Sequence, residues 1–168
     1  MKKNTRCEVQ DYLDICIASQ QLTIVKDGNK VQQYPISTAK NGPGELRGSE
    51  CTPRGWHQIR AKIGTEHPIN SVFVGRRPTG EIYTPQLGKQ HPERDWILTR
   101  ILWLGGLEPH KNRYCNVDST WRYIYIHGSP DELMTGTPQS HGCVRIKGVD
   151  LIELYDSVNV GHKVFIHE

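Results

Sequence analysis

The chain has 168 residues, of which 36% are hydrophobic and 23% charged, with 16 glycines and 10 prolines. This length suits one domain with a real core, and the composition excludes a disordered or fibrous protein. The formal net charge is only +3, and no run of Lys or Arg is long enough to follow a phosphate backbone, so we expect no nucleic-acid partner. We predict a single domain over residues 1–168, with its core at about 14–168.

The first residues carry positive charge, as an export signal does. The following stretch contains Glu8, Gln10, Asp11 and Asp14, so no apolar segment completes such a signal. No other apolar run is long enough to span a bilayer. These features predict a cytoplasmic protein with no membrane partner. A periplasmic location is the alternative if the sequence is a trimmed form of a longer chain.

The cysteines are scattered along the chain and form no Cys-x-x-Cys pair. Structural zinc sites usually contain such pairs, so we expect no metal and no cofactor. An odd number of thiols leaves at least one unpaired in a monomer. The five are Cys7, Cys16, Cys51, Cys115 and Cys143.

Strands are predicted through the first half of the chain, where β-branched and alternating apolar residues recur between turn signals. The turn at residues 27–29 makes the second and third strands a hairpin. Gly and Pro cluster at 41–44 and 52–55, which should be loops. Residues 76–95 hold three prolines and many charges, which predicts a long surface excursion that could act as a lid. The predicted strands are 14–19, 21–26, 31–38, 56–63 and 72–74.

The second half begins with residues 96–104, which are apolar and fit a strand or an irregular segment. Residues 123–127 have the alternation of a strand, with Ile124 and Ile126 on one face and His127 on the other, beside Tyr123 and Tyr125. Residues 128–139 are turn-rich and are expected to cross the mouth of a cleft.

The last segments combine a short strand, a helix and a closing strand. Residues 142–146 alternate so that Val144 and Ile146 point inward. Residues 149–158 have helical spacing, with Val149, Ile152 and Tyr155 on the repeated positions. A final strand follows at residues 163–166. The predicted fold class is therefore mainly β (a β-rich α+β domain), with one or two short helices.

Cys143 is the residue most suited to covalent chemistry. A thiol attacks as thiolate, so it needs a base or a positive environment. His141 precedes it by two positions, and His127 ends the preceding predicted strand. Gly142 lets the chain turn tightly, which can aim main-chain N–H groups at a developing oxyanion. Arg145 shares the face of Cys143, and its guanidinium suits a carboxylate.

The stretch Ser140-His141-Gly142-Cys143-Val144-Arg145, with His127-Gly128 upstream, resembles the catalytic domain of the YkuD-type L,D-transpeptidases. The loops Ser37-Thr38-Ala39-Lys40-Asn41-Gly42 and Thr52-Pro53-Arg54-Gly55 are similar to loops of the same family. The resemblance extends from Asp14 onward and is least clear over residues 64–120. It implies a β-sandwich or barrel.

The resemblance also implies roles for the motif residues. Cys143 would be the acylated nucleophile, and His127 the base that deprotonates it. The main-chain carbonyl of Gly128 would orient the imidazole, a role that does not depend on a side chain. Backbone N–H groups of His141, Gly142 and Cys143 would form the oxyanion hole.

Substrate binding is implied for Arg145, and Ser140 and His141 would support the cleft. The implied substrate is a peptidoglycan tetrapeptide stem (a muropeptide), attacked at the L-centre carbonyl of its third residue, a diamino acid, so that the terminal D-Ala leaves. Covalent acylation by carbapenems is also implied.

Structural roles are the alternatives. Cys143 could be a buried thiol, His127 a core imidazole, His141 a loop residue and Arg145 a solvated strand residue. A metal site built from the two histidines and the cysteine lacks an obvious acidic partner. Packing is the expected role of four aromatic residues, Tyr123, Tyr125, Trp56 and Trp103.

The motif does not decide the fate of the acyl-enzyme. Because we expect a cytoplasmic location, where water is the abundant acceptor, we favour an L,D-carboxypeptidase of murein recycling. An L,D-transpeptidase that forms 3-3 cross-links or exchanges D-amino acids is the first alternative. The second is a non-catalytic domain that binds wall peptides or a metal.

Overall fold

The structure is a computed structural model that describes residues 9–168. Residues 1–8 lie outside this range. They include the basic N-terminal residues and Glu8, on which part of the location prediction depends, and Cys7, one of the five cysteines. The strands are β1 (Tyr12–Cys16), β2 (Gln21–Lys26), β3 (Asn29–Ser37), β4 (Gly55–Ile63), β5 (Ser71–Val74), β6 (Arg77–Ile82), β7 (Ile97–Gly106), β8 (Tyr125–Ser129), β9 (Val144–Lys147) and β10 (Lys163–His167). The α-helices are α1 (Pro85–Gln90) and α2 (Gly148–Ser157).

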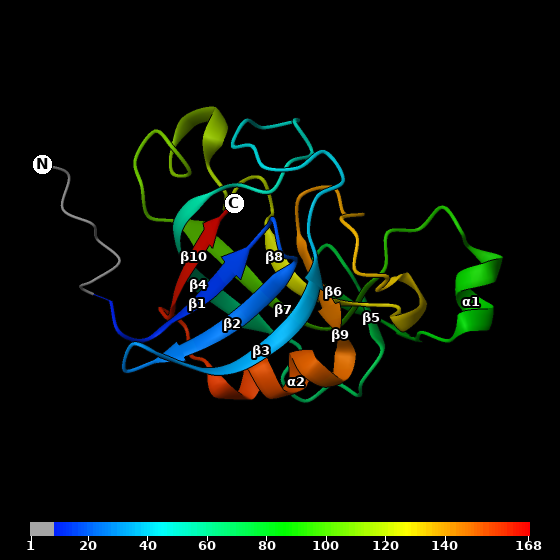
Figure 1. Ribbon diagram of the computed structural model, residues 1–168. Helices are drawn as coiled ribbons and strands as arrows, with labels where there is room; N and C mark the ends of the chain where they lie inside the picture. The colour runs from blue at the N-terminus through cyan, green and yellow to red at the C-terminus, as the bar shows by residue number, and fades with distance from the viewer. Residues whose placement is uncertain (1–8) are drawn as a thin grey trace, which may run out of the picture.

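The strands form a 10-stranded sheet that closes into a barrel. Hydrogen-bonded neighbours follow the order β4-β10-β1-β2-β3-β9-β8-β7, and β4 then pairs with β7. The hairpin of β5 and β6 continues outward from β7. Figure 1 shows α2 beneath the strands and α1 standing apart at the side of the hairpin. The predicted fold class, mainly β with one or two short helices, is confirmed.

The core fills the inside of the barrel, because alternate residues of each strand point there. The predicted alternation holds on the two strands that carry the motif: Ile124 and Ile126 lie inside with Val144 and Ile146. Their neighbours on β8 and β9 therefore point to the outer face of the barrel. Tyr123 is an exception to the prediction, since it lies before β8 in a turn with φ of 55°.

Two sequence predictions are corrected by the structure. The helix at α2 exists, and Tyr155 is buried as its predicted face requires, but Val149 is 62% exposed. The prediction missed Leu151 and Leu154, which are buried. The segment 76–95 is also more regular than predicted, because it contains β6 and α1. Thr84 caps α1 by accepting a hydrogen bond from the Leu87 N–H at 3.1 Å.

Residues 91–96 return the chain from α1 to β7 and lie against the outer face. Trp96 packs there with Val72, Tyr83 and Leu98 in a small apolar cluster. None of the helices described over residues 9–168 has the length and apolarity required to cross a membrane.

Candidate active site

The turn at residues 140–143 presents the cysteine at the start of β9. Ser140 is buried, and its hydroxyl donates to the Cys143 carbonyl at 2.5 Å while accepting from the Gly142 N–H at 3.2 Å. Gly142 has φ of 134°, a region that favours glycine. One hydroxyl therefore holds the turn together, and support of a substrate cleft by Ser140 stays a prediction.

Thr52 fixes the same turn from the opposite side, a role that was not predicted from the sequence. Its hydroxyl donates to the Gly142 carbonyl at 2.9 Å and accepts from the Ala39 N–H at 3.0 Å. A Cβ on Gly142 would lie 3.2 Å from Ile124 Cδ1. In the sequence, the only indication of a role for Thr52 was that the loop Thr52-Pro53-Arg54-Gly55 is similar to a loop of the family.

His127 is 1% exposed and is oriented by its neighbour. Its Nδ1 lies 2.7 Å from the Gly128 carbonyl oxygen. Because a carbonyl only accepts, Nδ1 carries the proton and Nε2 has the free lone pair. Burial lowers the pKa of His127, against the opposing effects of Asp95 and of the Gly128 carbonyl. The imidazole is therefore neutral at pH 7 and able to accept a proton.

Gly128 is constrained by more than its carbonyl. A Cβ at this position would lie 2.3 Å from the Leu98 carbonyl oxygen on β7. The position therefore requires glycine for the close approach of β7 and β8, although the orienting carbonyl itself belongs to the main chain. The predicted contact between the Gly128 carbonyl and the imidazole is present, and the need for glycine at this position is a separate, steric requirement.

The Cys143 sulfur lies in an apolar contact region, although the residue as a whole is only partly buried. Sγ accepts from the Tyr125 N–H at 3.3 Å and donates to the Tyr123 carbonyl at 3.4 Å. Burial raises the pKa of the Cys143 thiol to about 12, and the Tyr125 N–H offsets only part of this. The resting residue is therefore a protonated thiol.

His127 lies on β8, and Cys143 comes directly before β9, the strand that pairs with β8 in parallel. The register pairs His127 with Arg145 and Ile126 with Val144. His127 and Arg145 therefore share the outer face. Cys143, just before β9, lies on this side too, because it packs against Tyr125 and accepts the Tyr125 N–H. Sγ has its hydrogen bonds to backbone groups rather than to the imidazole, so proton transfer requires a rotation of the thiol.

Arg145 is buried and paired, so the alternative of a solvated strand residue is wrong. It is 8% exposed, and its Nη2 lies 2.8 Å from Asp95 Oδ1. Asp95 comes from the segment before β7, in which no motif is recognisable. Its carboxylate also influences the pKa values of His127 and Cys143, which places it in their electrostatic environment.

A cavity of about 220 Å³ adjoins this ion pair. Its wall includes Asp95, Ser129, His141 and Arg145. Within residues 9–168, two buried atoms of this wall, Ser129 Oγ and Arg145 Nε, have no hydrogen-bond partner. Unmet hydrogen-bond capacity at a cavity is a feature of ligand sites. His141 is exposed here, in agreement with a loop residue at the edge of a cleft.

Trp103 and Tyr125, which were expected only to pack, lie near Cys143, and both contact the Arg76 side chain. Trp103 and Tyr125 are in contact, with ring centroids 6.2 Å apart. The Arg76 guanidinium lies 4.6 Å from the Trp103 centroid, and its Nη1 donates to the Tyr125 hydroxyl at 3.0 Å. The hairpin of β5 and β6 thus brings a positive charge to the cysteine face, which the sequence did not reveal.

The predicted oxyanion donors are only partly free. The Gly142 N–H is already bonded to Ser140 Oγ, so it would have to exchange partners to bind an oxyanion. The His141 and Cys143 N–H groups belong to the same turn.

Among residues 9–168, no group of three or more His, Cys, Asp or Glu side chains is arranged to hold a metal ion.

Solved structures share this fold at low sequence identity. An L,D-transpeptidase from Xylanimonas cellulosilytica DSM 15894 matches with a TM-score of 0.60 and 20% identity, over 94% of this chain and 60% of that one. An L,D-transpeptidase from Mycobacterium smegmatis matches with a TM-score of 0.56 and 19% identity, over 95% of this chain and 59% of that one. L,D-transpeptidase 3 from Mycobacterium tuberculosis, in complex with a faropenem-derived adduct, matches with a TM-score of 0.55 and 18% identity, over 95% of this chain and 60% of that one.

The chain thus spans about 60% of the length of these structures. A search of curated proteins found no match. The family model of the L,D-transpeptidase catalytic domain, YkuD, matches residues 10–166, which is nearly the whole chain. This chain belongs to the YkuD family of L,D-transpeptidase catalytic domains.

Proposed function

We propose that this protein is a cysteine L,D-carboxypeptidase that removes the terminal D-Ala from peptidoglycan tetrapeptide stems. The observation that carries the proposal is the His127 imidazole. Its Nδ1 is fixed on the Gly128 carbonyl, its Nε2 is unprotonated, and it lies on the same face as the Cys143 thiol. A neutral, oriented base on the strand that pairs with the strand after Cys143 supports general-base activation of the thiol.

Acylation begins when Cys143 Sγ attacks the carbonyl carbon before D-Ala and His127 Nε2 takes the thiol proton. The carbonyl oxygen becomes an oxyanion, for which N–H groups of the 140–143 turn are the proposed donors. The C–N bond then breaks, and His127 gives its proton to the departing D-Ala amine. A thioester on Cys143 remains.

Deacylation uses water in the same geometry. His127 takes a proton from water as its oxygen attacks the thioester carbonyl. The C–S bond breaks, and the sulfur recovers the proton as a thiol. The products are a tripeptide carboxylic acid and the free enzyme.

The cavity beside Arg145 supports a subsite for the departing D-Ala. Arg145 and Ser129 supply unmet hydrogen-bond capacity for a carboxylate. The cavity, at about 220 Å³, is smaller than the pockets of about 300–1,000 Å³ that hold drug-sized ligands. That size suits one small leaving group such as D-Ala.

Transfer to an amine is the second candidate, favoured by the family itself. Relatives matched by fold include an L,D-transpeptidase in complex with imipenem and one with a faropenem-derived adduct. By analogy we propose that carbapenems acylate Cys143. Incubation with imipenem should add the drug's mass to the intact protein and leave Cys143→Ala unmodified.

The test is mass spectrometry of a disaccharide tetrapeptide incubated with the purified protein, with Cys143→Ala as control. Tripeptide and free D-Ala, without dimer at high substrate concentration, are the expected products. Cross-linked dimer, or exchange of D-Ala for an added D-amino acid, would contradict the proposed hydrolysis and identify the protein as a transpeptidase. Absence of all products would favour the non-catalytic binding domain. A cytoplasmic location stays a prediction, tested by fractionation of cells that make the native protein.

A further inference from the structure

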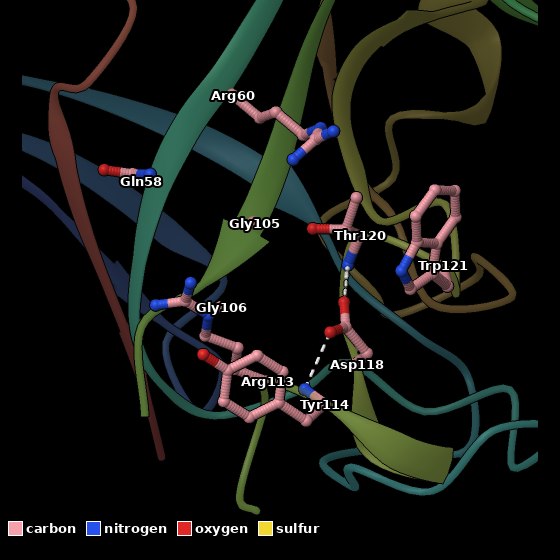
Figure 2. Close-up of a pocket in the computed structure, with 9 residues that line it drawn as sticks. All are labelled: Gln58, Arg60, Gly105, Gly106, Arg113, Tyr114, Asp118, Thr120 and Trp121. Carbon is pink, nitrogen blue, oxygen red and sulfur yellow. Dashed lines mark hydrogen bonds between the residues drawn. The ribbon is translucent and has the colours of Figure 1, made fainter. Parts of the chain in front are cut away.

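A second cavity, of about 210 Å³, opens on the outer face of β4 and β7 (Figure 2). Gln58 and Arg60 come from β4, whereas the opposite wall comes from the segment between β7 and β8. We call this cavity the arginine cleft. Its defining residues are Arg60, Gly105, Gly106, Arg113, Tyr114 and Trp121.

Two glycines of β7, Gly105 and Gly106, line the cleft and let the following loop pack closely against the strand. A Cβ on Gly106 would lie 1.9 Å from the Asn112 carbonyl oxygen, and one on Gly105 would lie 3.1 Å from Thr120 Oγ1. The loop after β7 therefore lies directly against the strand. Any larger residue at Gly106 would push this wall away from β7.

The charge of the arginine cleft is positive. Arg60 and Arg113 are exposed, and in the described part of the chain neither forms an ion pair with a carboxylate. Asp118 is the acidic residue of the lining, and its two oxygens accept from backbone N–H groups of Tyr114 at 2.7 Å and Thr120 at 2.9 Å, as the dashed lines in Figure 2 show. The two guanidinium groups are thus available to an anion from outside.

Exposed aromatic rings border the same cavity. Trp121 is 55% exposed and Tyr114 is 47% exposed. The Arg113 guanidinium lies 4.8 Å from the Tyr114 centroid, which holds its charge at the rim. Large exposed aromatics beside unpaired arginines are common in binding sites, where they supply apolar contact around a charged group.

Trp103 connects the arginine cleft to the cysteine. The Arg60 guanidinium lies 5.4 Å from the Trp103 ring centroid, and the Tyr125 ring centroid lies 6.2 Å from it. The backbone N–H of Tyr125 donates to Cys143 Sγ. An extended peptide advances about 3.5 Å per residue, so a few residues reach from the thiol across Trp103 to Arg60.

We propose that the arginine cleft binds an internal carboxylate of the peptide that is cut at Cys143. This inference rests on the proposed function, and it adds a subsite for the retained part of the substrate, separate from the D-Ala cavity. Arg60 and Arg113 bind the carboxylate by charge-assisted hydrogen bonds, and Trp121 and Tyr114 cover the apolar atoms around it.

The experiment measures D-Ala release from two disaccharide tetrapeptides that both keep the terminal carboxylate. One has free internal carboxylates, and in the other they are amidated. Arg60→Gln and Arg113→Gln are compared with wild type. Lys30→Gln, which removes one positive charge from the exposed end of the β2–β3 hairpin, is the matched control.

With the free acid, each arginine variant should raise KM about tenfold and leave kcat unchanged, since a hydrogen bond to a charged group is lost. With the amidated substrate, the variants should equal wild type. Equal effects on both substrates, or no effect beyond that of Lys30→Gln, would overturn the proposal. So would a change confined to dimer formation, because the occupant would then be an accepting peptide.

Calorimetry separates this inference from the proposed function. The Cys143→Ala protein should bind the free-acid tetrapeptide about tenfold more tightly than Cys143→Ala/Arg60→Gln does, with equal thermal stability of the two proteins. Absence of D-Ala release by wild type would refute the proposed carboxypeptidase alone. Equal affinities in calorimetry would refute the arginine cleft even if turnover is observed.

Discussion

Two buried histidines, His57 on β4 and His127 on β8, are held alike at one ring nitrogen and differently at the other. In both, Nδ1 lies against a nearby carbonyl, that of Gly55 at 3.0 Å and that of Gly128 at 2.7 Å. His57 Nε2 is bound to Ser119 Oγ at 2.9 Å, whereas His127 Nε2 has no such partner among residues 9–168.

The difference separates a structural imidazole from a reactive one. His57 uses both nitrogens to join β4 to the loop before β8. His127 uses one nitrogen for orientation and keeps the other for a proton. Burial lowers the pKa in both cases, to about 4 for His57, so a lowered pKa alone does not distinguish them. The two histidines are distinguished by Nε2, which is hydrogen-bonded in His57 and, within the described part of the chain, free in His127.

The sharpest test replaces each histidine in turn. His127→Asn should lower kcat/KM for D-Ala release by about 10²–10⁴-fold, the usual contribution of a general base. His57→Asn should leave kcat/KM near the wild-type value and lower the free energy of unfolding by about 1–3 kcal/mol through a lost buried hydrogen bond. Comparable losses of activity in the two variants, measured on folded protein, would remove the distinction.

The thiol should follow the pH dependence of a buried, protonated group. Because the pKa of Cys143 is raised to about 12, the thiolate fraction should increase about tenfold per pH unit from pH 7 to pH 10. Peptide mapping after brief iodoacetamide treatment should therefore show Cys143 alkylated slowly at pH 7 and progressively faster up to pH 10. A rate that levels off near neutral pH would indicate a thiolate paired with imidazolium instead.

Asp95 offers a smaller test, since both histidines have a carboxylate nearby that raises the pKa, Asp95 for His127 and Glu108 for His57. Asp95→Asn removes a negative charge and frees the Arg145 guanidinium, and both changes lower the pKa of His127. The acid limb of the pH profile of kcat/KM should therefore move to lower pH. Glu108→Gln is the matched control and should not move it.

The smallest effect concerns stability. The pKa of His57 is about 4 in the folded protein and near 6.5 in the unfolded chain, so only the unfolded state binds the proton between these values. The free energy of unfolding should fall as pH decreases from about 6.5 to about 4, by up to about 1.4 kcal/mol per unit. Urea titrations of wild type and His57→Asn should give a shallower dependence in the variant.

Much of this molecule could be predicted from its sequence, for physical reasons. Alternation with period two reports which side of a strand is buried, so Ile124, Ile126, Val144 and Ile146 were placed correctly. The helix was predicted, but its buried face was predicted only at Tyr155. Leu151 and Leu154 are buried by contact with the barrel, and a short amphipathic pattern fits more than one face.

The site residues that the sequence missed come from distant segments. Asp95 reaches Arg145 from 50 positions away, and Arg76 reaches Tyr125 from 49. Thr52 braces the turn of Cys143 across 90 positions. These contacts depend on the pairing of β5 and β7 and on barrel closure, which local patterns do not encode.

Closure of the barrel also decides where the sheet ends. Since β4 pairs with β7, the hydrogen-bonding edge of the sheet that remains in residues 9–168 belongs to β6. That strand carries Pro78, which has no N–H to donate, together with Gly80 and the charged residues Arg77 and Glu81. Such an edge is a poor template for another strand, which protects the protein from edge-to-edge aggregation beside its own reactive face.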